Sequence, residues 1–332
     1  MKAFVVEKNH NDEIISGVKD VLKPICGENE VIIKATYSSL NYKDALSSVG
    51  NPGVTRVFPH ITGVDVVGEI VETKSNIFKV GQKVIVTGYD LGMNTNGGHS
   101  QYVKVPASWV VAIPSSLSDK EAMIYGTAGL TAALSINELI DNNITQESGD
   151  ILVTGATGGV GSLAVAILSK LGFNVVALSG KEDKISYLKE IGASEVVLRE
   201  EFLKDSSKAL LKPRFAGVID TTGGDILSTA LKQTNYDGVV TCCGLTASSS
   251  LNTNIFPFIL RGVRLIGIDS VECSLDKKQD AWEKLAGKYS VKNLNEITNE
   301  ISLDGIKDAY EKLLNGTAVG RYLVKIDNKN GI

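Results

Sequence analysis

Apolar and polar positions follow two different patterns along this chain. In residues 1 to about 113, short apolar runs are separated by turn residues, and this spacing predicts an all-β lobe. The predicted strands cover residues 2–7, 30–37, 64–72, 83–87, 100–105 and 109–113. From residue 119 a helical pattern begins, with Ala, Leu and Ile at helical spacing between residues 123 and 139.

After Asp150 the predicted strands alternate with helices, which is typical of a doubly wound parallel sheet in an α/β fold. The six strands of this sheet are expected near Ile151, Val175, Glu195, Gly217, Gly238 and Leu265. The tail changes character again, to a helix at 304–314 and a strand at 321–326, and we expect it to fold back onto the β lobe. The predicted domains are therefore residues 1–118, completed by 300–332, and residues 119–299.

Residues 151–165 form an apolar strand that breaks into glycines and continues as a helix, an order typical of a dinucleotide-binding turn. Gly155 allows a tight turn, Gly158 leaves room for a pyrophosphate, and Gly161 lets the helix pack close to the strand. The helix N-terminus offers unpaired N–H groups and the positive end of its dipole to the phosphates. A purely structural turn is the alternative, but the apolar strand before it and the helical face after it favour a nucleotide.

The end of the next strand, residues 174–179, bears on which nucleotide is bound. An NAD-binding protein normally has an acidic residue there for the ribose hydroxyls, and this chain has none. The strand ends in Ser179, Gly180 and Lys181, which suit the 2′-phosphate of NADP. Alternatively, Ser179 caps the following helix and Lys181 is an ordinary solvated lysine. The pattern favours NADPH as the cofactor.

Composition narrows the class of protein. At 332 residues the chain exceeds the size of one hydrophobic core, and 43% hydrophobic with 22% charged residues is ordinary for a soluble globule. A net charge of −4 offers no basic surface for nucleic acid. The first residues reach an acid at Glu7 without the apolar h-region of a signal peptide, so we expect neither a secretory signal nor a membrane-spanning stretch. The four cysteines are too few for a disulfide scaffold and lack the spacing of metal ligands, so we expect the protein to reside in the reducing cytoplasm.

Six segments carry a resemblance to a known family over the whole length of the chain: residues 38–44, 62–68, 126–132, 153–162, 179–181 and 256–270. The chain resembles the medium-chain dehydrogenase/reductases, which join a GroES-like β lobe to a Rossmann domain with a cleft between them. Within that superfamily it looks most like the zinc-free quinone oxidoreductase group, and specifically the acrylyl-CoA reductase (NADPH) branch. One departure is Lys181, where close relatives typically carry Arg, which recognises phosphate in a bidentate manner.

The metal ligands of the alcohol-dehydrogenase relatives are missing. Asn41 stands where those relatives have Cys, and Gly63, Val64 and Asp65 stand where they have Gly-His-Glu. The structural-metal cysteines are also missing. The only histidines, His10, His60 and His99, lie far apart in sequence, and we expect each to be a surface or packing residue and not a metal ligand. We therefore expect no metal, and an acceptor whose double bond is already polarised.

The resemblance also implies roles for individual residues. It places Asn41 and Tyr42 beside the nicotinamide, with Tyr42 as a candidate for orienting the cofactor and for delivering a proton. Tyr42 could instead be a packing residue, and Asp65 could organise a hydrogen-bond network or, as we favour, stabilise a turn. The other implied cofactor-binding residues are Thr157, Gly158, Gly159, Val160, Ser179, Gly180, Lys181, Thr221, Leu265 and Arg321.

Three arginines leave alternatives open. Arg321 could reach a nucleotide or CoA phosphate, or form a salt bridge between domains. Arg261 and Arg264 flank a strand that family members use for dimer pairing, so solvated or interface charges are favoured over contacts to CoA phosphate. An unpaired outer edge at residues 263–268 predicts a homodimer.

Three functions remain. The favoured one is NADPH-dependent reduction of the C=C bond of a 2-enoyl thioester, most naturally acrylyl-CoA to propionyl-CoA, with hydride added at Cβ. The second is an NADPH-dependent quinone or enone oxidoreductase, and the third is a non-catalytic NADPH-binding protein. The loop at residues 90–98 is expected to shape the acceptor site, and its conformation cannot be derived from the sequence.

Overall fold

The computed structural model describes residues 1–327, and the chain folds into two compact units. Unit 1 contains Met1–Thr127, Ser270–Gly287 and the chain from Asn293 on, and unit 2 contains Ala128–Asp269 with Lys288–Lys292. The boundaries expected at 118/119 and 299/300 therefore differ from those observed, mainly because Ser270–Gly287 joins unit 1. Helix α8 (Leu275–Ala286) lies in that segment and buries its apolar face in unit 1.

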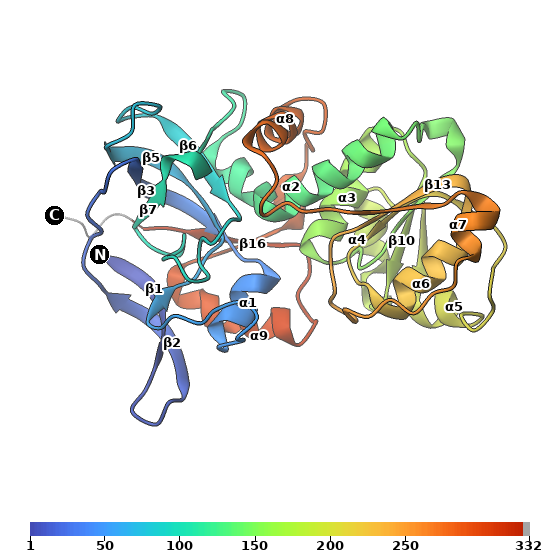
Figure 1. Ribbon diagram of the computed structural model, residues 1–332, viewed down its shortest axis with the longest axis horizontal. Helices are drawn as coiled ribbons and strands as arrows, with labels where there is room; N and C mark the ends of the chain where they lie inside the picture. Colours follow the sequence, from blue (N-terminus) through green and yellow to red (C-terminus); the bar gives the residue numbers. More distant parts are fainter. Residues whose placement is uncertain (328–332) are drawn as a thin grey trace. The chain divides into compact units, whose positions relative to one another are not determined.

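Unit 2 is a parallel sheet in the order β11-β10-β9-β12-β13-β14, with helices packed on the strands they connect (Figure 1). The order runs outward from β9 in one direction and from β12 in the other, so the switch point lies between these two strands. The predicted α/β fold with a doubly wound sheet is confirmed. The bounds of its strands are β9 Asp150–Val153, β10 Val175–Ser179, β11 Glu195–Leu198, β12 Phe215–Asp220, β13 Thr234–Cys242 and β14 Arg264–Gly267, and those of its helices are α3 Gly159–Lys170, α4 Ile185–Glu190, α5 Arg199–Leu203, α6 Gly224–Gln233 and α7 Phe256–Arg261.

The central strands of unit 2, β10 and β12, are mostly apolar because helices cover both faces of a parallel sheet. Every residue of β10 and of β12 is buried. The core of this unit is formed by side chains from β9, β10, β12 and β13 together with those of α6. This rigid sheet fixes where the loops at the carboxyl ends of the strands stand.

Unit 1 is a β lobe with two sheets. The larger follows the path β15-β16-β3-β5-β6-β8 with β7 also paired to β3, and the smaller has the order β2-β1-β4. The bounds are β1 Lys2–Lys8, β2 Ile14–Asp20, β3 Glu30–Ser39, β4 His60–Ile61, β5 Asp65–Thr73, β6 Lys83–Thr87, β7 Tyr102–Pro106, β8 Val111–Ala112, β15 Thr298–Ile301 and β16 Arg321–Lys325, with helices α1 Tyr42–Ser48 and α9 Ile306–Leu314.

The tail returns to this lobe as expected, since β16 pairs antiparallel with β3. Strands β2, β4 and β15 were not predicted, because their residues are mixed in polarity and only pairing with a neighbour makes them strands.

Helix α2 (Asp119–Asp141) is broken at Gly126, where the backbone has a φ of +50° and a ψ of −154°. A Cβ at this position would lie 2.4 Å from Ser39 Oγ and 2.5 Å from Asp65 Oδ2, so only glycine fits. The break turns the amide of Thr127 towards the Asp65 carboxylate. Among residues 1–327 no helix has both the length and the apolar character that crossing a bilayer requires.

Candidate functional site

Close contacts require the glycines between β9 and α3. Gly155 has a φ of +57°, and a Cβ there would lie 2.4 Å from Thr221 Oγ1. A Cβ on Gly161 would lie 2.4 Å from the carbonyl oxygen of Gly155. Gly158, the N-cap residue of α3, is less crowded, because a Cβ there would have its nearest neighbour 3.3 Å away. The first and third glycines thus close the turn, and the second is the least crowded of the three.

The first turn of α3 fits a pyrophosphate. The leading amides of a helix have no intrahelical acceptor, and the helix dipole adds partial positive charge there. Gly159 and Val160 are partly exposed, whereas Thr157 is buried beside them. The rest of α3 is buried against the sheet, which holds this turn in place. These residues could hold the phosphates of a dinucleotide.

The carboxyl end of β10 offers a second anion site. Ser179 is buried, and its Oγ accepts a hydrogen bond from the backbone N–H of Lys181 at 3.0 Å. Gly180 is exposed, and Lys181 is half-buried, so partial burial lowers the pKa of its ammonium. A hydroxyl and a cation thus lie next to each other without a carboxylate in the strand, which suits a 2′-phosphate.

Arg199 joins this site, although the sequence analysis missed it. Its Nη2 lies 2.0 Å from where a Cβ of Gly180 would stand, so the guanidinium rests against that glycine. Arg199 directly follows β11, and β10 and β11 are paired in parallel with Ser179 opposite Leu198. Parallel strands end at the same edge of the sheet, so a basic residue after β11 was the signal available in the sequence. Arg199 supplies the forked guanidinium that Lys181 lacks.

Thr221 and Leu265 belong to the neighbouring strand ends. The Thr221 hydroxyl donates to the carbonyl of Thr154 at 2.9 Å, which ties β12 to the glycine turn. A cavity of about 580 Å³ lies at the ends of β12, β13 and β14, and Leu265 lines it with Cys242 and Cys243. Burial raises the pKa of Cys243 to about 12, and it also raises that of Cys242. Both thiols therefore remain protonated at neutral pH and are poor nucleophiles.

In unit 1, Asn41 and Tyr42 start helix α1. Asn41 is its N-cap residue in a capping box with Asp44, whose carboxylate accepts from the backbone N–H of Asn41 at 2.8 Å. Tyr42 is half-buried, and its hydroxyl makes no hydrogen bond within residues 1–327. Burial and the charge of Asp65 raise the pKa of Asp44 to about 7, although backbone amides also donate to its carboxylate.

Asp65 is the centre of a buried hydrogen-bond network. Its side chain is fully buried and accepts from Ser39 Oγ at 2.6 Å, from Asn41 Nδ2 at 2.8 Å and from the Thr127 amide at 2.9 Å. The Thr127 hydroxyl donates to its other oxygen. The network role that we considered less favourable for Asp65 is therefore the one observed. Its consequence is that the Asn41 side-chain amide has a fixed orientation.

Arg321 supports the same network through further buried hydrogen bonds. It is buried, and it donates to the carbonyls of Ile124 at 2.8 Å and Leu40 at 3.1 Å and to Ser39 Oγ at 2.9 Å. Its Nη2 lies 3.9 Å from Asp65 Oδ2. Since these contacts occupy the guanidinium, the phosphate contact expected for Arg321 has no support in this geometry, and its observed role is to hold the loop that carries Asn41.

The two other arginines are also engaged within unit 2. Arg261 is buried and donates to the carbonyls of Lys232, Thr234 and Leu211. Arg264 is exposed and donates to Asn142 Oδ1 at 2.6 Å. Arg261 is thus a structural residue that joins the end of α6 to the segment before β12.

His60 and His99 are buried, whereas His10 is exposed. His60 Nε2 lies 2.6 Å from Ser47 Oγ, and His99 Nδ1 lies 2.9 Å from Thr62 Oγ1. Burial lowers the pKa of His60 to about 4 and that of His99 to about 3, so both rings are neutral. In the described part of the chain, no three His, Cys, Asp or Glu side chains gather into a group that could hold a metal.

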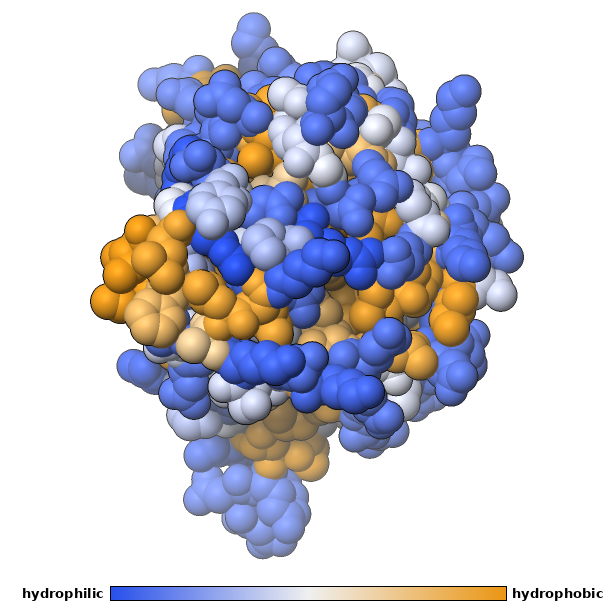
Figure 2. Space-filling view, turned by 90° about the vertical axis from the view of Figure 1, so that its right-hand side faces the viewer, coloured by the Kyte–Doolittle hydropathy of each residue, from blue (hydrophilic) through white to orange (hydrophobic). Residues whose placement is uncertain are grey.

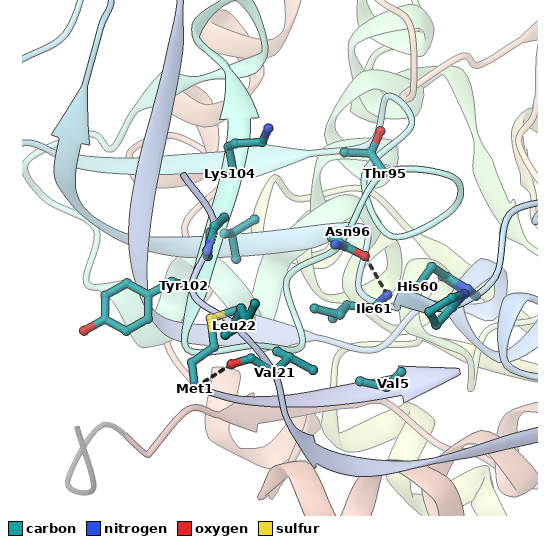
Figure 3. A pocket seen from close by; sticks show the side chains of 13 residues that line it. Met1, Val5, Val21, Leu22, His60, Ile61, Thr95, Asn96, Tyr102 and Lys104 are labelled. Carbon is teal, nitrogen blue, oxygen red and sulfur yellow. Dashed lines mark hydrogen bonds between the residues drawn. The ribbon is translucent and has the colours of Figure 1, made fainter. Parts of the chain in front are cut away.

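A second cavity, of about 250 Å³, lies in unit 1 near the N-terminus (Figure 3). Its lining is mostly apolar. Two of its polar groups are used in the wall itself, since the Met1 amine donates to the Val21 carbonyl and the Asn96 side chain accepts from the Ile61 amide. The chemistry-bearing residues therefore lie elsewhere, at the strand ends of unit 2 and around Asn41 in unit 1.

Two protein-family profiles match the chain. One, described as the alcohol dehydrogenase GroES-like domain, covers residues 27–115, and the other, described as a zinc-binding dehydrogenase, covers residues 159–287. They correspond to the β lobe and to the region of the parallel sheet.

Three full-length relatives are similar to the chain. YhfP of Bacillus subtilis, provisionally named a quinone oxidoreductase, is 41% identical over 98% of both chains, and its structure with NAD bound has a TM-score of 0.94. The acrylyl-CoA reductase AcuI of Ruegeria pomeroyi is 35% identical over 98% of this chain and 99% of its own. The YhdH oxidoreductase of Salmonella enterica in complex with NADP is 39% identical, with a TM-score of 0.95 over 98% of this chain and all of the other.

Proposed function

The chain belongs to the medium-chain dehydrogenase/reductase superfamily, and on this basis we propose that it reduces the C=C bond of a 2-enoyl thioester with NADPH, most naturally acrylyl-CoA to propionyl-CoA. It is an NADPH-dependent oxidoreductase that acts on a small-molecule acceptor. The observation that carries the cofactor assignment is the anion site of Ser179, Lys181 and Arg199 beside a glycine cradle. The AcuI relative supports the thioester as acceptor.

The chain's own residues would bind the cofactor, orient the acceptor and supply a proton. The α3 N-terminus and the residues Thr157, Gly158, Gly159 and Val160 would hold the pyrophosphate. When bound, NADPH supplies the hydride that adds to Cβ of the thioester, and a proton then adds at Cα. Because the thioester carbonyl already draws electrons from Cβ, the step needs no metal. The chain must position the acceptor and stabilise the enolate charge.

Asn41 and Tyr42 are the proposed residues at the reacting double bond. Asp65 holds the Asn41 amide in one orientation, so this polar group costs little reorganisation when charge develops. Within the described residues the Tyr42 hydroxyl has no protein partner, which leaves it available to orient a ligand or to donate the proton at Cα. A Tyr42→Phe variant should lower kcat if this hydroxyl is the donor.

A quinone or enone reductase is the alternative, because it shares every cofactor residue and is supported by the name given to YhfP. A non-catalytic NADPH-binding protein is the further alternative. The test is a side-by-side measurement of kcat/KM for acrylyl-CoA, crotonyl-CoA and 1,4-benzoquinone with NADPH. A higher value for acrylyl-CoA supports the proposal, a clear preference for the quinone supports the alternative, and no turnover of any acceptor supports the non-catalytic role.

We further propose a homodimer. Strand β14 is the outermost strand of the parallel sheet, and α7, which directly precedes it, exposes Ile259 and Leu260. Figure 2 shows that the face of the molecule it draws carries groups of hydrophobic side chains among the hydrophilic ones. Ile255 and Phe256, at the start of the same helix, are also exposed, and we call these four side chains the apolar patch. An unpaired strand edge flanked by apolar side chains is best satisfied by the same edge of a second copy across a two-fold axis.

A reducing compartment, the cytoplasm, is the proposed location. All four cysteines are free thiols: Cys26, Cys242, Cys243 and Cys273. Free cysteines in this number favour a reducing environment.

A further inference from the structure

Lys278 is a charged side chain that is completely buried in unit 1. It lies on α8, and its ammonium donates to the carbonyl oxygens of Thr87 and Val271, each at 2.9 Å. The same Nζ lies 3.3 Å from the centroid of the Tyr89 ring. A buried methionine or leucine would fill this space without the cost of removing a charge from water, but neither could bind two carbonyl oxygens and an aromatic face.

The groups around Lys278 form a strained turn. Gly88 has a φ of +77° and Tyr89 a φ of +53°, so a non-glycine residue adopts the left-handed conformation directly after a glycine. A Cβ on Gly88 would lie 3.0 Å from Val271 Cα, and the Tyr89 amide donates to the Val271 carbonyl at 3.3 Å. The Tyr89 ring stacks on Trp109, with centroids 5.2 Å apart and planes 9° from parallel.

This turn begins the segment 90–98, which we name the acceptor loop. The loop and its flanking residues are bonded to the turn before β5: the Gly88 amide donates to the Val64 carbonyl at 2.9 Å, and the Gly98 amide to the Gly63 carbonyl at 2.7 Å. A Cβ on Gly98 would lie 2.0 Å from the Asp65 carbonyl oxygen, so the two backbones are in direct contact. A shift of the acceptor loop must therefore move the backbone of residues 63–65.

We infer that Lys278 is a positioning residue for the acceptor, because it holds the Gly88–Tyr89 turn, and thus the acceptor loop, against the turn that carries Asp65. Three contacts connect Lys278 to Asn41. The Lys278 ammonium lies over the Tyr89 ring, where the acceptor loop begins; the acceptor loop bonds to the backbone before Asp65; and the Asp65 carboxylate accepts from the side-chain amide of Asn41. The inference rests on the proposed function, because it assigns Asn41 and the acceptor loop to the acceptor. It concerns the position of the acceptor and does not involve the residues that hold NADPH.

The first experiment compares Lys278→Met, Lys278→Arg and a matched control, Lys277→Met. Lys277 is exposed and directly precedes Lys278 on α8. Lys278→Met should lower kcat/KM for acrylyl-CoA about 10- to 100-fold, since a displacement of about 1 Å can have an effect of this size. It should leave the Kd of NADPH within about twofold. Lys278→Arg keeps the cation and should recover most of the activity, and Lys277→Met should resemble the wild type.

Near-ultraviolet circular dichroism supplies a readout that does not depend on turnover. The chain has two tryptophans, and one of them, Trp109, stacks on Tyr89. Lys278→Met should change the aromatic band of this stack, whereas Lys277→Met should not. If Lys278→Met leaves both the band and kcat/KM for every acceptor unchanged, or weakens NADPH binding by the same factor as kcat/KM, the inference is wrong.

Tyr89→Leu covers the case in which Lys278→Met does not fold, because it removes the aromatic face and keeps the ammonium bonded to its two carbonyls. It should lower kcat/KM for the acceptor with the Kd of NADPH unchanged, and wild-type kinetics would overturn the inference. If the wild type does not reduce acrylyl-CoA, the proposed function fails, and the same variants are then compared with 1,4-benzoquinone. A loss confined to the acceptor supports the role of Lys278 even in that case.

Discussion

Replacing Arg199 with alanine should weaken the binding of NADPH and leave that of NADH unchanged. The guanidinium rests against Gly180 and has no hydrogen bond or ion pair within residues 1–327, so the fold itself loses little. A hydrogen bond to a charged group contributes about 1.5–3 kcal/mol. Arg199 is exposed, which favours the lower part of that range. About 1.5–2 kcal/mol corresponds to an increase in Kd of about 10- to 30-fold.

The assay is a fluorescence titration with NADPH and NADH, together with KM for both cofactors at one fixed acceptor concentration. The matched control is Lys184→Ala, because this nearby cation is already paired with Asp183 at 2.8 Å. It should change the Kd of NADPH by less than about twofold. Since the contact is electrostatic, the effect of Arg199→Ala should also diminish as the salt concentration rises.

A second variant tests the geometry rather than the charge. In Gly180→Ala the new Cβ would overlap the end of the Arg199 side chain, which can swing away because it is flexible. This variant keeps both cations and should still raise the Kd of NADPH, in the same direction as Arg199→Ala. The reasoning is refuted if Arg199→Ala leaves the Kd of NADPH unchanged, or if it weakens NADH to the same extent.

Four further predictions follow from the site and the fold. Lys181→Glu should weaken NADPH selectively by repelling the 2′-phosphate, and an equal loss for NADH in kinetic assays would contradict this. Elemental analysis should find no stoichiometric zinc, and chelators should leave the activity unchanged; a loss that zinc restores would overturn metal independence. Light scattering should give a dimer mass that Ile259→Glu, which places a charge in the apolar patch, converts to a monomer; a wild-type monomer at micromolar concentration would count against the dimer. Because the pKa of His99 falls from 6.5 to about 3 on folding, the unfolded state takes up a proton first as the pH drops. Relative to His99→Gln, the unfolding free energy of the wild type in urea should therefore decrease by about 2 kcal/mol between pH 7 and pH 5, and parallel pH profiles would show that the ring is not buried neutral.

Features that depend on neighbouring residues were predictable from the sequence alone. The parallel sheet followed from apolar runs that alternate with helical patterns, and the tight turn between β9 and α3 followed from the spacing of Gly155, Gly158 and Gly161 in the sequence. The proximity of Ser179 and Lys181 also followed from the sequence, because they are two residues apart. Such features are predictable because periodicity and backbone conformation are properties of short segments.

Only the tertiary structure decided which distant groups meet. It placed Arg199 against Gly180, it made Asp65 the centre of a network, and it buried Arg321 among protein acceptors. It also brought Lys278 to Thr87, nearly two hundred residues away, and with it assigned α8 to unit 1. The sequence does not show whether a given arginine or aspartate is exposed or buried. Its role depends on the acceptors and donors that strand pairing brings within about 3 Å of it, and these partners cannot be identified from a short segment.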